Sequence, residues 1–182
     1  MHYHTLQQID DAIRVCTSCQ LHATRNTPVP GAGNPQADIF FIGEGPGAKE
    51  DEHGLPFIGR SGELLTQLLQ EAGLTRKEVF ITSLVKCRPP KNRNPLQPEI
   101  TACHPFLKAQ LHVIQPKIIC TLGSSAATTL LGIKKPLSTI RGKWFDYEGI
   151  KLLPAFHPAY LLRSRSKIPV FQEDLEKLMK AQ

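Results

Sequence analysis

The stretch from Gly43 to Gly62 reads GEGPGAKEDEHGLPFIGRSG and combines glycines, prolines and carboxylates more densely than any simple structural role explains. Residues 37–42 (ADIFFI) come directly before it and form a short apolar run, which is typical of a buried parallel strand. Residues 61–72 follow with leucines at helical spacing. In open α/β sheets, ligands bind at the carboxyl ends of the strands, where a turn connects a strand to the helix that follows. The stretch is therefore a candidate binding site.

The chemistry of this turn favours a neutral polar ligand over a phosphate. Its glycines allow main-chain N–H groups to approach a ligand closely, and Glu44, Glu50 and Asp51 place carboxylates beside them. A phosphate cradle avoids that much negative charge, and neither a Gly-Lys-Ser nor a Gly-x-Gly-x-x-Gly pattern is present. The alternative is a mobile surface loop. The apolar residues 56–58 (PFI) argue against a loop that is merely solvated.

Length, charge and cysteine content narrow the class of protein. A chain of 182 residues most simply forms one domain, here residues 1–182, with a sizeable core. The formal net charge of +6 favours an anionic partner. No apolar run approaches membrane-spanning length and no export signal is visible at residues 1–11, so we expect a cytoplasmic protein without a membrane partner. Five cysteines in such a chain are more typical of metal ligands or core thiols than of disulfides.

Strand-like and helix-like patterns alternate along the chain. Strands are expected at residues 37–42, 79–85, 117–122 and 151–156, and helices at 6–15, 61–72, from 98 onward and at 123–131. This alternation predicts an α/β fold, namely a three-layer α/β/α sandwich with a mainly parallel four-stranded central sheet. The candidate sites then lie at the strand ends Gly43, Ser83 and His157.

Four of the cysteines have the spacing of a metal site. Cys16 and Cys19 form a C-x-x-C pair, and Cys87 and Cys103 can supply two further ligands. Four thiolates suit either a Zn site or a 4Fe-4S cluster, and the spacing alone does not choose between them. Cys120 lies within an apolar strand and is expected to be a buried, inert thiol.

Two further segments have a composition that suits DNA. Four of the eight residues from 86 to 93 are basic, namely Lys86, Lys91 and the two arginines Arg88 and Arg93. Such a run is usually a solvated face, but a loop fixed by a nearby cysteine site could hold cations against phosphates. The second segment, AFHPAYLLR at residues 155–163, places a histidine at a strand end before two leucines and a cation.

Taken together, these motifs resemble the iron-sulfur uracil-DNA glycosylases, family 4 of the uracil-DNA glycosylase superfamily. The resemblance is carried by GEGPG at 43–47, GLPFIG at 54–59, LVKCRPP at 84–90 and HPAYLLR at 157–163, in this order along the chain. It implies a monofunctional glycosylase that flips uracil out of DNA and hydrolyses its N-glycosidic bond, which begins base excision repair. It also implies a 4Fe-4S cluster on Cys16, Cys19, Cys87 and Cys103. DNA containing uracil is the implied partner, with a sliding clamp or downstream repair enzymes as candidate protein partners and a monomer as the expected state.

The resemblance assigns roles to single residues. Glu44 and His157 are the expected catalytic residues, because Glu44, through its side chain or its backbone, would position the attacking water and His157 would donate a hydrogen bond to uracil O2. The amide of Gly45 would contribute a second donor to O2, Phe57 would stack on the ring, and Glu50 would crowd C5 against thymine. The DNA-binding residues expected on this basis are Lys86, Arg88, Arg93, Leu161, Leu162 and Arg163, with one of the leucines filling the space of the flipped base.

Two positions depart from patterns of the superfamily, and one segment lacks a residue found in a related branch. Gly45 stands where the better-known branch has an Asp that handles water, so the identity of a general base is open. Ser83 stands where many family-4 sequences have an Asn that reads the uracil edge, and its single hydroxyl predicts a broadened range of deaminated bases. Residues 86–98 contain no histidine, so we expect none of the covalent crosslinking to DNA seen in a related branch.

Two other classes of protein remain as alternatives. The first is a noncatalytic DNA-binding module with a structural Zn ion and an inert His157. The second is a small-molecule hydrolase that uses Glu44, Glu50, Asp51 and His157 on another nucleoside, although the basic loop and the paired leucines argue against it.

Overall fold

The computed structural model describes residues 3–182 and contains a six-stranded sheet in the order β1-β3-β2-β4-β6-β5. The four expected strands form its parallel centre: β2 (Ile39–Gly43), β3 (Phe80–Ser83), β4 (Ile118–Leu122) and β6 (Ile150–Ala155). The strand count of four was wrong, because two short antiparallel strands extend the edges. These are β1 (Ala32–Gly33) beside β3 and β5 (Phe145–Tyr147) beside β6, and runs of two and three residues are too short to show a period of two.

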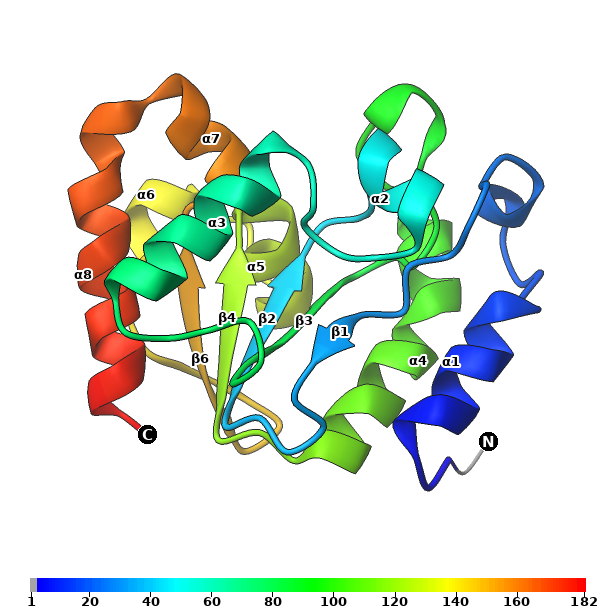
Figure 1. Ribbon diagram of the computed structural model, residues 1–182, viewed down its shortest axis with the longest axis horizontal. Helices are drawn as coiled ribbons and strands as arrows, with labels where there is room; N and C mark the ends of the chain where they lie inside the picture. The colour runs from blue at the N-terminus through cyan, green and yellow to red at the C-terminus, as the bar shows by residue number, and fades with distance from the viewer. Residues whose placement is uncertain (1–2) are drawn as a thin grey trace.

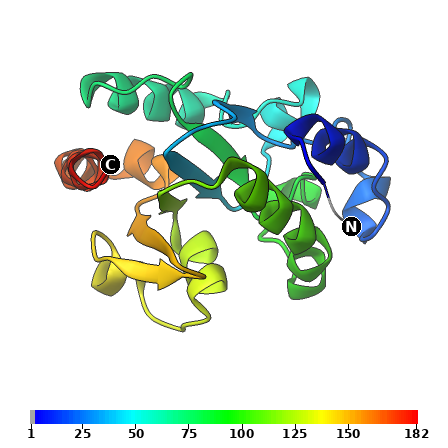
Figure 2. The ribbon, with the colours of Figure 1, turned by 90° about the horizontal axis from the view of Figure 1, so that it is seen from below.

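Helices cover both faces of the sheet, as Figures 1 and 2 show. One face packs against α1 (Leu6–Arg14), α4 (Gln97–Ile114) and α5 (Ser124–Leu131). The other face packs against α3 (Arg60–Glu71), α7 (Pro158–Arg163) and α8 (Ile168–Lys180). Strand β2 shows how the two cores are separated, since Phe40 and Ile42 belong to the first and Ile39 and Phe41 to the second. The expected α/β/α layering is confirmed.

Two segments for which we expected no helix contain short helices. The first, α2 (Ala48–His53), lies inside the Gly-rich stretch and ends at Gly54, whose φ of 72° is left-handed. The second is α7, which begins directly after His157. A small helix, α6 (Leu137–Ile140), precedes the β5–β6 hairpin. Within residues 3–182, no helix is long and apolar enough to cross a membrane.

The carboxyl ends of the parallel strands meet at one edge of the sheet. Gly43 at the end of β2 is in register with Ser83 at the end of β3, and β6 runs directly into His157. Because parallel strands all end on the same side, residues far apart in sequence become neighbours there. The fold therefore brings the candidate site together at the edge that the sequence predicted.

Helix α8 packs against β6 on the same face of the sheet as α3 and α7. Its Asp174 is fully buried and accepts a hydrogen bond from Arg141 at 3.1 Å. Burial raises the pKa of Asp174 to about 6, against the opposing effects of Arg141 and Lys177. The Arg141 guanidinium also lies 5.8 Å from the ring centre of Phe156, the residue before His157. A buried polar contact thus supports the turn that carries the histidine.

Candidate active site

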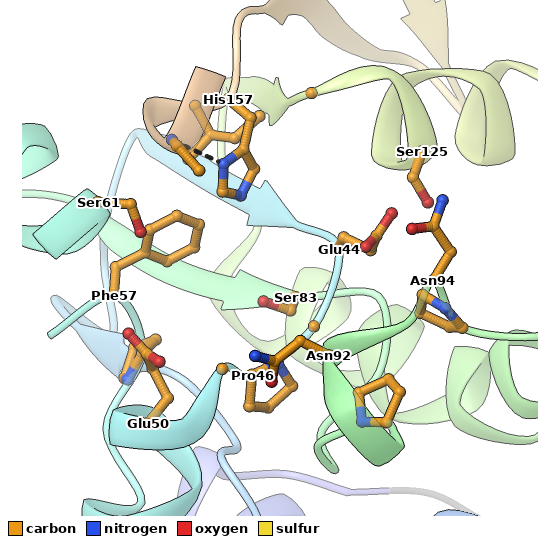
Figure 3. Close-up of a pocket in the computed structure, with 18 of the residues that line it drawn as sticks. Glu44, Pro46, Glu50, Phe57, Ser61, Ser83, Asn92, Asn94, Ser125 and His157 are labelled. Atoms are coloured by element: carbon orange, nitrogen blue, oxygen red, sulfur yellow. Dashed lines mark hydrogen bonds between the residues drawn. The ribbon is translucent and has the colours of Figure 1, made fainter. Parts of the chain in front are cut away.

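A pocket of about 610 Å³ opens at the carboxyl edge of the sheet (Figure 3). Its lining includes all six of the residues expected to contact uracil, namely Glu44, Gly45, Glu50, Phe57, Ser83 and His157. Its volume falls in the range typical of small-molecule sites. The structure therefore brings the predicted base-binding residues together around one cavity.

Burial keeps the His157 imidazole neutral, and a backbone hydrogen bond fixes its tautomer. The residue is the N-cap of α7, and its Nδ1 accepts the N–H of Ala159 at 3.0 Å (Figure 3). Burial, together with the nearby charge of Arg163, lowers the pKa of His157 to about 4 against the opposing effect of Glu50. Because Nδ1 is an acceptor, the ring proton of the neutral form sits on Nε2. The site thus holds a hydrogen-bond donor without a positive charge.

The ring of Phe57 forms one wall of the pocket. Its centre lies 5.6 Å from that of the His157 ring, and the two planes are tilted by 34°. The ring also lies against Gly43, where an added Cβ would come within 2.7 Å of Phe57 Cζ. Glycine at the end of β2 is therefore required for the aromatic side chain to occupy this position.

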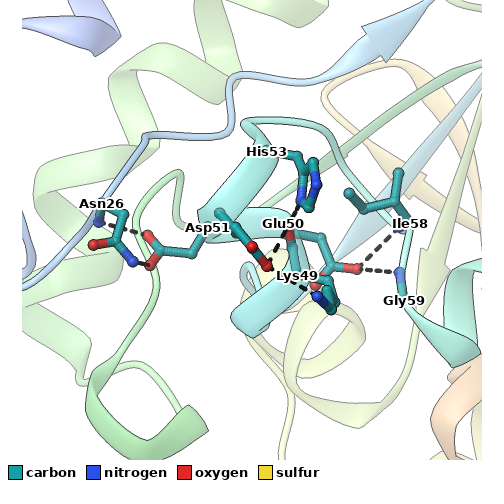
Figure 4. A network of polar contacts seen from close by, with 8 residues as sticks. Asn26, Lys49, Glu50, Asp51, His53, Ile58 and Gly59 are labelled. Carbon is teal, nitrogen blue, oxygen red and sulfur yellow. Dashed lines mark hydrogen bonds and ion pairs between the residues drawn. The ribbon is translucent and has the colours of Figure 1, made fainter.

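Two carboxylates of the Gly-rich stretch, Glu50 and Asp51, bond to neighbouring segments of the chain (Figure 4). Glu50 Oε1 accepts the N–H groups of Ile58 and Gly59, both at 3.0 Å. Asp51 is buried and accepts the N–H of Asn26 at 2.9 Å and its Nδ2 at 2.7 Å. The carboxylates of Glu50 and Asp51 were part of the argument against a phosphate ligand. In the structure they accept hydrogen bonds that order the neighbouring loops.

Gly45 has no room for a side chain in this conformation. A Cβ there would come within 2.8 Å of Val85 Cγ2, so an Asp at this position would require Val85 to shift. Glu44, its neighbour, points its carboxylate into the pocket toward Asn94 and Ser125 (Figure 3). A carboxylate from Glu44 is therefore the acidic group at this end of the pocket.

The structure corrects the expectation for Lys86. Its side chain is buried, and its Nζ donates to Thr82 Oγ1, to the carbonyl of Ser83 and to Gln110 Oε1. Burial lowers the pKa of Lys86 to about 8. An ammonium bonded by three internal acceptors is not presented to a DNA phosphate, so Lys86 is an internal residue of the fold.

The other predicted DNA-binding residues are distributed unevenly. Leu161 is fully buried in the core under α3 and α8, which is a second correction, whereas its neighbour Leu162 is half-buried. Arg163 is exposed and lines the pocket. Arg93 also lines it, but both of its terminal nitrogens bond to Glu99, at 2.9 and 2.6 Å. Arg88 bonds to Asn92 Oδ1 at 2.7 Å.

Sequence reasoning missed part of the rim. The residues concerned are polar and line the pocket, namely Asn92, Asn94, Ser124 and Ser125. Ser124 and Ser125 follow the end of β4 and so satisfied the strand-end rule that identified Ser83, but they were interpreted only as a helix start.

The four predicted metal-binding cysteines line a second, small cavity beneath α1 and α4. They are Cys16, Cys19, Cys87 and Cys103, and all are free thiols. Within residues 3–182, no three His, Cys, Asp or Glu side chains are arranged to hold one metal ion. Cys120 lies elsewhere, buried in the core that packs against α3 and α8.

The chemistry around these thiols fits a metal-thiolate group. Burial raises the pKa of Cys87, and that of Cys103 to about 11. Thiols so buried become thiolates only beside compensating positive charge. Arg25 Nη1 donates to Cys87 Sγ at 3.1 Å, and the backbone N–H of Lys86 donates to Cys103 Sγ at 3.3 Å. Donors to sulfur and nearby cations are the features that stabilise thiolate ligands.

Comparison with known proteins identifies relatives along nearly the whole chain. A model of the uracil DNA glycosylase superfamily matches residues 30–180. A type-4 uracil-DNA glycosylase of Thermotoga maritima is 44% identical over 176 residues, which cover 94% of this chain and 92% of the relative. One of Saccharolobus solfataricus is also 44% identical, with 97% and 86% covered. A type-5 uracil-DNA glycosylase of Thermus thermophilus is 35% identical over 71% of this chain and 68% of its own length.

The protonation state of His157 provides a direct test of the site geometry. Its pKa is lowered to about 4, so its ring signals should not titrate between pH 5 and 8 in NMR spectra. Histidine in an unstructured peptide, the reference sample, titrates at about 6.5. The ring ¹⁵N shifts should show a protonated Nε2 and an unprotonated Nδ1. A midpoint between pH 6 and 7, or a protonated Nδ1 in the neutral form, would contradict this geometry.

Proposed function

Because the chain belongs to the type-4 uracil-DNA glycosylases of the uracil-DNA glycosylase superfamily, we propose that the pocket at the carboxyl edge of its sheet receives a uracil flipped out of DNA. The enzyme hydrolyses the N-glycosyl bond of uracil in DNA and thereby acts in DNA repair. Flipping is necessary because this bond is inaccessible to a protein while the base remains stacked in a duplex.

The observation that carries the mechanism is the neutral His157 with its proton on Nε2. Breaking the bond between C1′ and N1 leaves a cation-like sugar and a uracil anion with charge on O2. His157 Nε2–H donates to that oxygen, and the backbone N–H of Gly45 is the second donor. A neutral donor whose orientation is fixed by the Ala159 N–H requires no rearrangement during the reaction.

The remaining pocket residues bind and orient the base and the water. Phe57 stacks on the uracil ring, and the hydroxyl of Ser83 faces its polar edge. Glu44 positions the attacking water, which completes the reaction without a covalent enzyme intermediate. Glu50 limits the space at C5 in addition to holding the N–H groups of Ile58 and Gly59.

DNA contacts the rim of this pocket through the residues that remain accessible. Arg163 and Arg88 meet phosphates, and Leu162 rather than Leu161 fills the space left by the flipped base. The net charge of +6 assists the association with DNA without selecting a sequence. Arg93 contributes only where a phosphate can compete with Glu99.

A 4Fe-4S cluster would be held by Cys16, Cys19, Cys87 and Cys103, as family membership and the cysteine-lined cavity support. When bound, such a cluster would supply a structural crosslink between the N-terminal segment and the chain around α4. Arg25 Nη1 and the backbone N–H of Lys86 donate to two of the sulfur atoms that would hold it. Free thiols that bind such a group suit the reducing cytoplasm. We further propose that the protein acts as a monomer and hands its product to downstream repair enzymes or acts near a sliding clamp.

Base release from a uracil-containing oligonucleotide tests the proposed chemistry. His157→Ala should lower the rate by about a hundredfold or more, because one donor to the O2 charge is lost. Glu44→Gln should also lower the rate, through loss of water positioning. The control is His112→Ala, which removes an exposed histidine on α4 and should leave the rate unchanged. A wild-type protein that binds uracil-containing and normal DNA alike and releases no base would instead be a noncatalytic DNA-binding module.

The base range tests the role of Ser83. A serine hydroxyl must donate or accept through a single oxygen, whereas an asparagine amide presents a separate donor and acceptor side by side, so discrimination should be weaker. Wild type should release hypoxanthine or xanthine at a measurable rate relative to uracil, and Ser83→Asn should lower that ratio. Equal ratios in the two proteins, measured with matched oligonucleotides, would remove Ser83 as the determinant.

The cysteine site is tested by colour and stability together. Cys87→Ala should lose the visible absorbance and bound iron of the purified protein and lower its melting temperature, since a buried crosslink is removed. Cys120→Ala is the matched control, because it removes a buried cysteine outside the cavity and should retain the colour. A colourless Cys87→Ala protein with full stability and activity would contradict the structural role, and stoichiometric zinc without iron in the wild type would contradict the cluster.

A further inference from the structure

The backbone of the residues that carry the Phe57 ring is in an unusual conformation. Phe57 has a φ of 50°, in the left-handed region that residues other than glycine rarely adopt. Such a conformation persists only where the surroundings determine it. The segment from Pro56 to Gly59 must therefore be held by specific contacts, and these contacts set the direction of the ring.

The carboxylate side of this support is Glu50, which accepts the N–H groups of Ile58 and Gly59 at 3.0 Å each. Arg76 provides the positively charged side of this support. Its Nη2 donates to the carbonyl of Pro56 at 2.6 Å, and its Nη1 donates to the carbonyl of Phe57 at 3.0 Å. Four backbone groups within residues 56–59 are thus bonded to two oppositely charged side chains.

Arg76 is suited to this task by its shape and its surroundings. The guanidinium is a planar fork, so two of its nitrogens can bond adjacent carbonyls in a fixed geometry. Arg76 is partly buried, and this burial lowers the pKa of its guanidinium against the opposing charge of Glu50. A further contact joins Nη1 to Thr66 Oγ1 of α3 at 3.4 Å.

The backbone of Arg76 is itself fixed by a tight turn between α3 and β3. Thr75 donates its N–H and its hydroxyl to Glu78 Oε2, both at 2.7 Å. The N–H of Glu78 returns a bond to the carbonyl of Thr75 at 3.1 Å. The guanidinium is therefore presented from a rigid base, while Arg76 itself does not line the pocket.

We propose that Arg76 is a positioning residue for the glycosylase reaction, which fixes the Phe57 ring for stacking on the flipped uracil by bonding the carbonyls of Pro56 and Phe57. Arg76 does not touch the base and acts through Phe57. The inference rests on the proposed function, in which Phe57 stacks on uracil. Stacking stabilises the bound base in the ground state and the transition state alike, so its loss appears chiefly in KM.

The test is a double-mutant cycle on base release. Arg76→Met should lower kcat/KM about tenfold, mainly by raising KM, a loss in the range typical of one base-aromatic contact. Phe57→Ala should lower kcat/KM at least as much. In the Phe57→Ala background, Arg76→Met should have no further effect, because the ring that it positions is absent. Lys77→Met is the matched control, since it removes an exposed cation from the same turn and should leave both constants unchanged.

A second variant covers the case in which Arg76→Met does not fold. Arg76→Lys keeps the charge but cannot bond two carbonyls in a fork, so we expect an intermediate rise in KM, which Phe57→Ala should again abolish. An equal loss with and without the Phe57 ring would overturn the inference in favour of a general structural role, as would variants with wild-type KM. A wild-type protein that releases no uracil would contradict the proposed function and the inference together.

Discussion

Much of this structure depends on the three hydrogen bonds that the buried ammonium of Lys86 donates. The ammonium is bonded to Thr82, to the carbonyl of Ser83 and to Gln110, and Gln110 in turn donates to the carbonyl of Pro30. The backbone N–H of the same residue donates to Cys103. The end of β3, helix α4 and the cysteine cavity are thereby joined in one hydrogen-bonded unit. Each acceptor left unpaired in the interior would destabilise the fold by about 1–3 kcal/mol.

The same residue shows where sequence reasoning fails. A lysine within a run of cations predicts a solvated face, and nothing local distinguishes Lys86 from Lys91, which is exposed. Only the tertiary positions of Thr82 and Gln110 decide the outcome. Leu161 and Leu162 present the same problem, because adjacent leucines can be assigned to core or surface only once the orientation of α7 is known. By contrast, β2 and α3 could be predicted from local sequence. A short continuous apolar run indicates a buried strand, and leucines at helical spacing indicate a helix.

The pocket owes its chemistry to how its polar groups are divided between structure and substrate. Asp51 is used entirely within the protein, on Asn26, and Glu50 commits Oε1 to the segment beyond Phe57. We predicted these residues as part of a site from the density of carboxylates in the sequence, which does not reveal the partners of each carboxylate. Arg76 carried no signal at all, since it lies in an ordinary turn remote from every motif. What remains open to a ligand is a small set of groups: the Glu44 carboxylate, the Ser83 hydroxyl and a neutral imidazole.

The direction of α8 has a practical consequence. The helix begins near the pocket edge, one short 3-10 turn (Arg165–Lys167) after α7, and runs down the sheet to the opposite edge (Figure 1). The C-terminal end therefore lies far from the strand ends that form the pocket. If a molecule were attached to a bead or sensor chip through Gln182, its pocket would point away from the support and into the solution. Immobilisation by this end is thus the orientation that leaves passing nucleic acid free to reach the cavity.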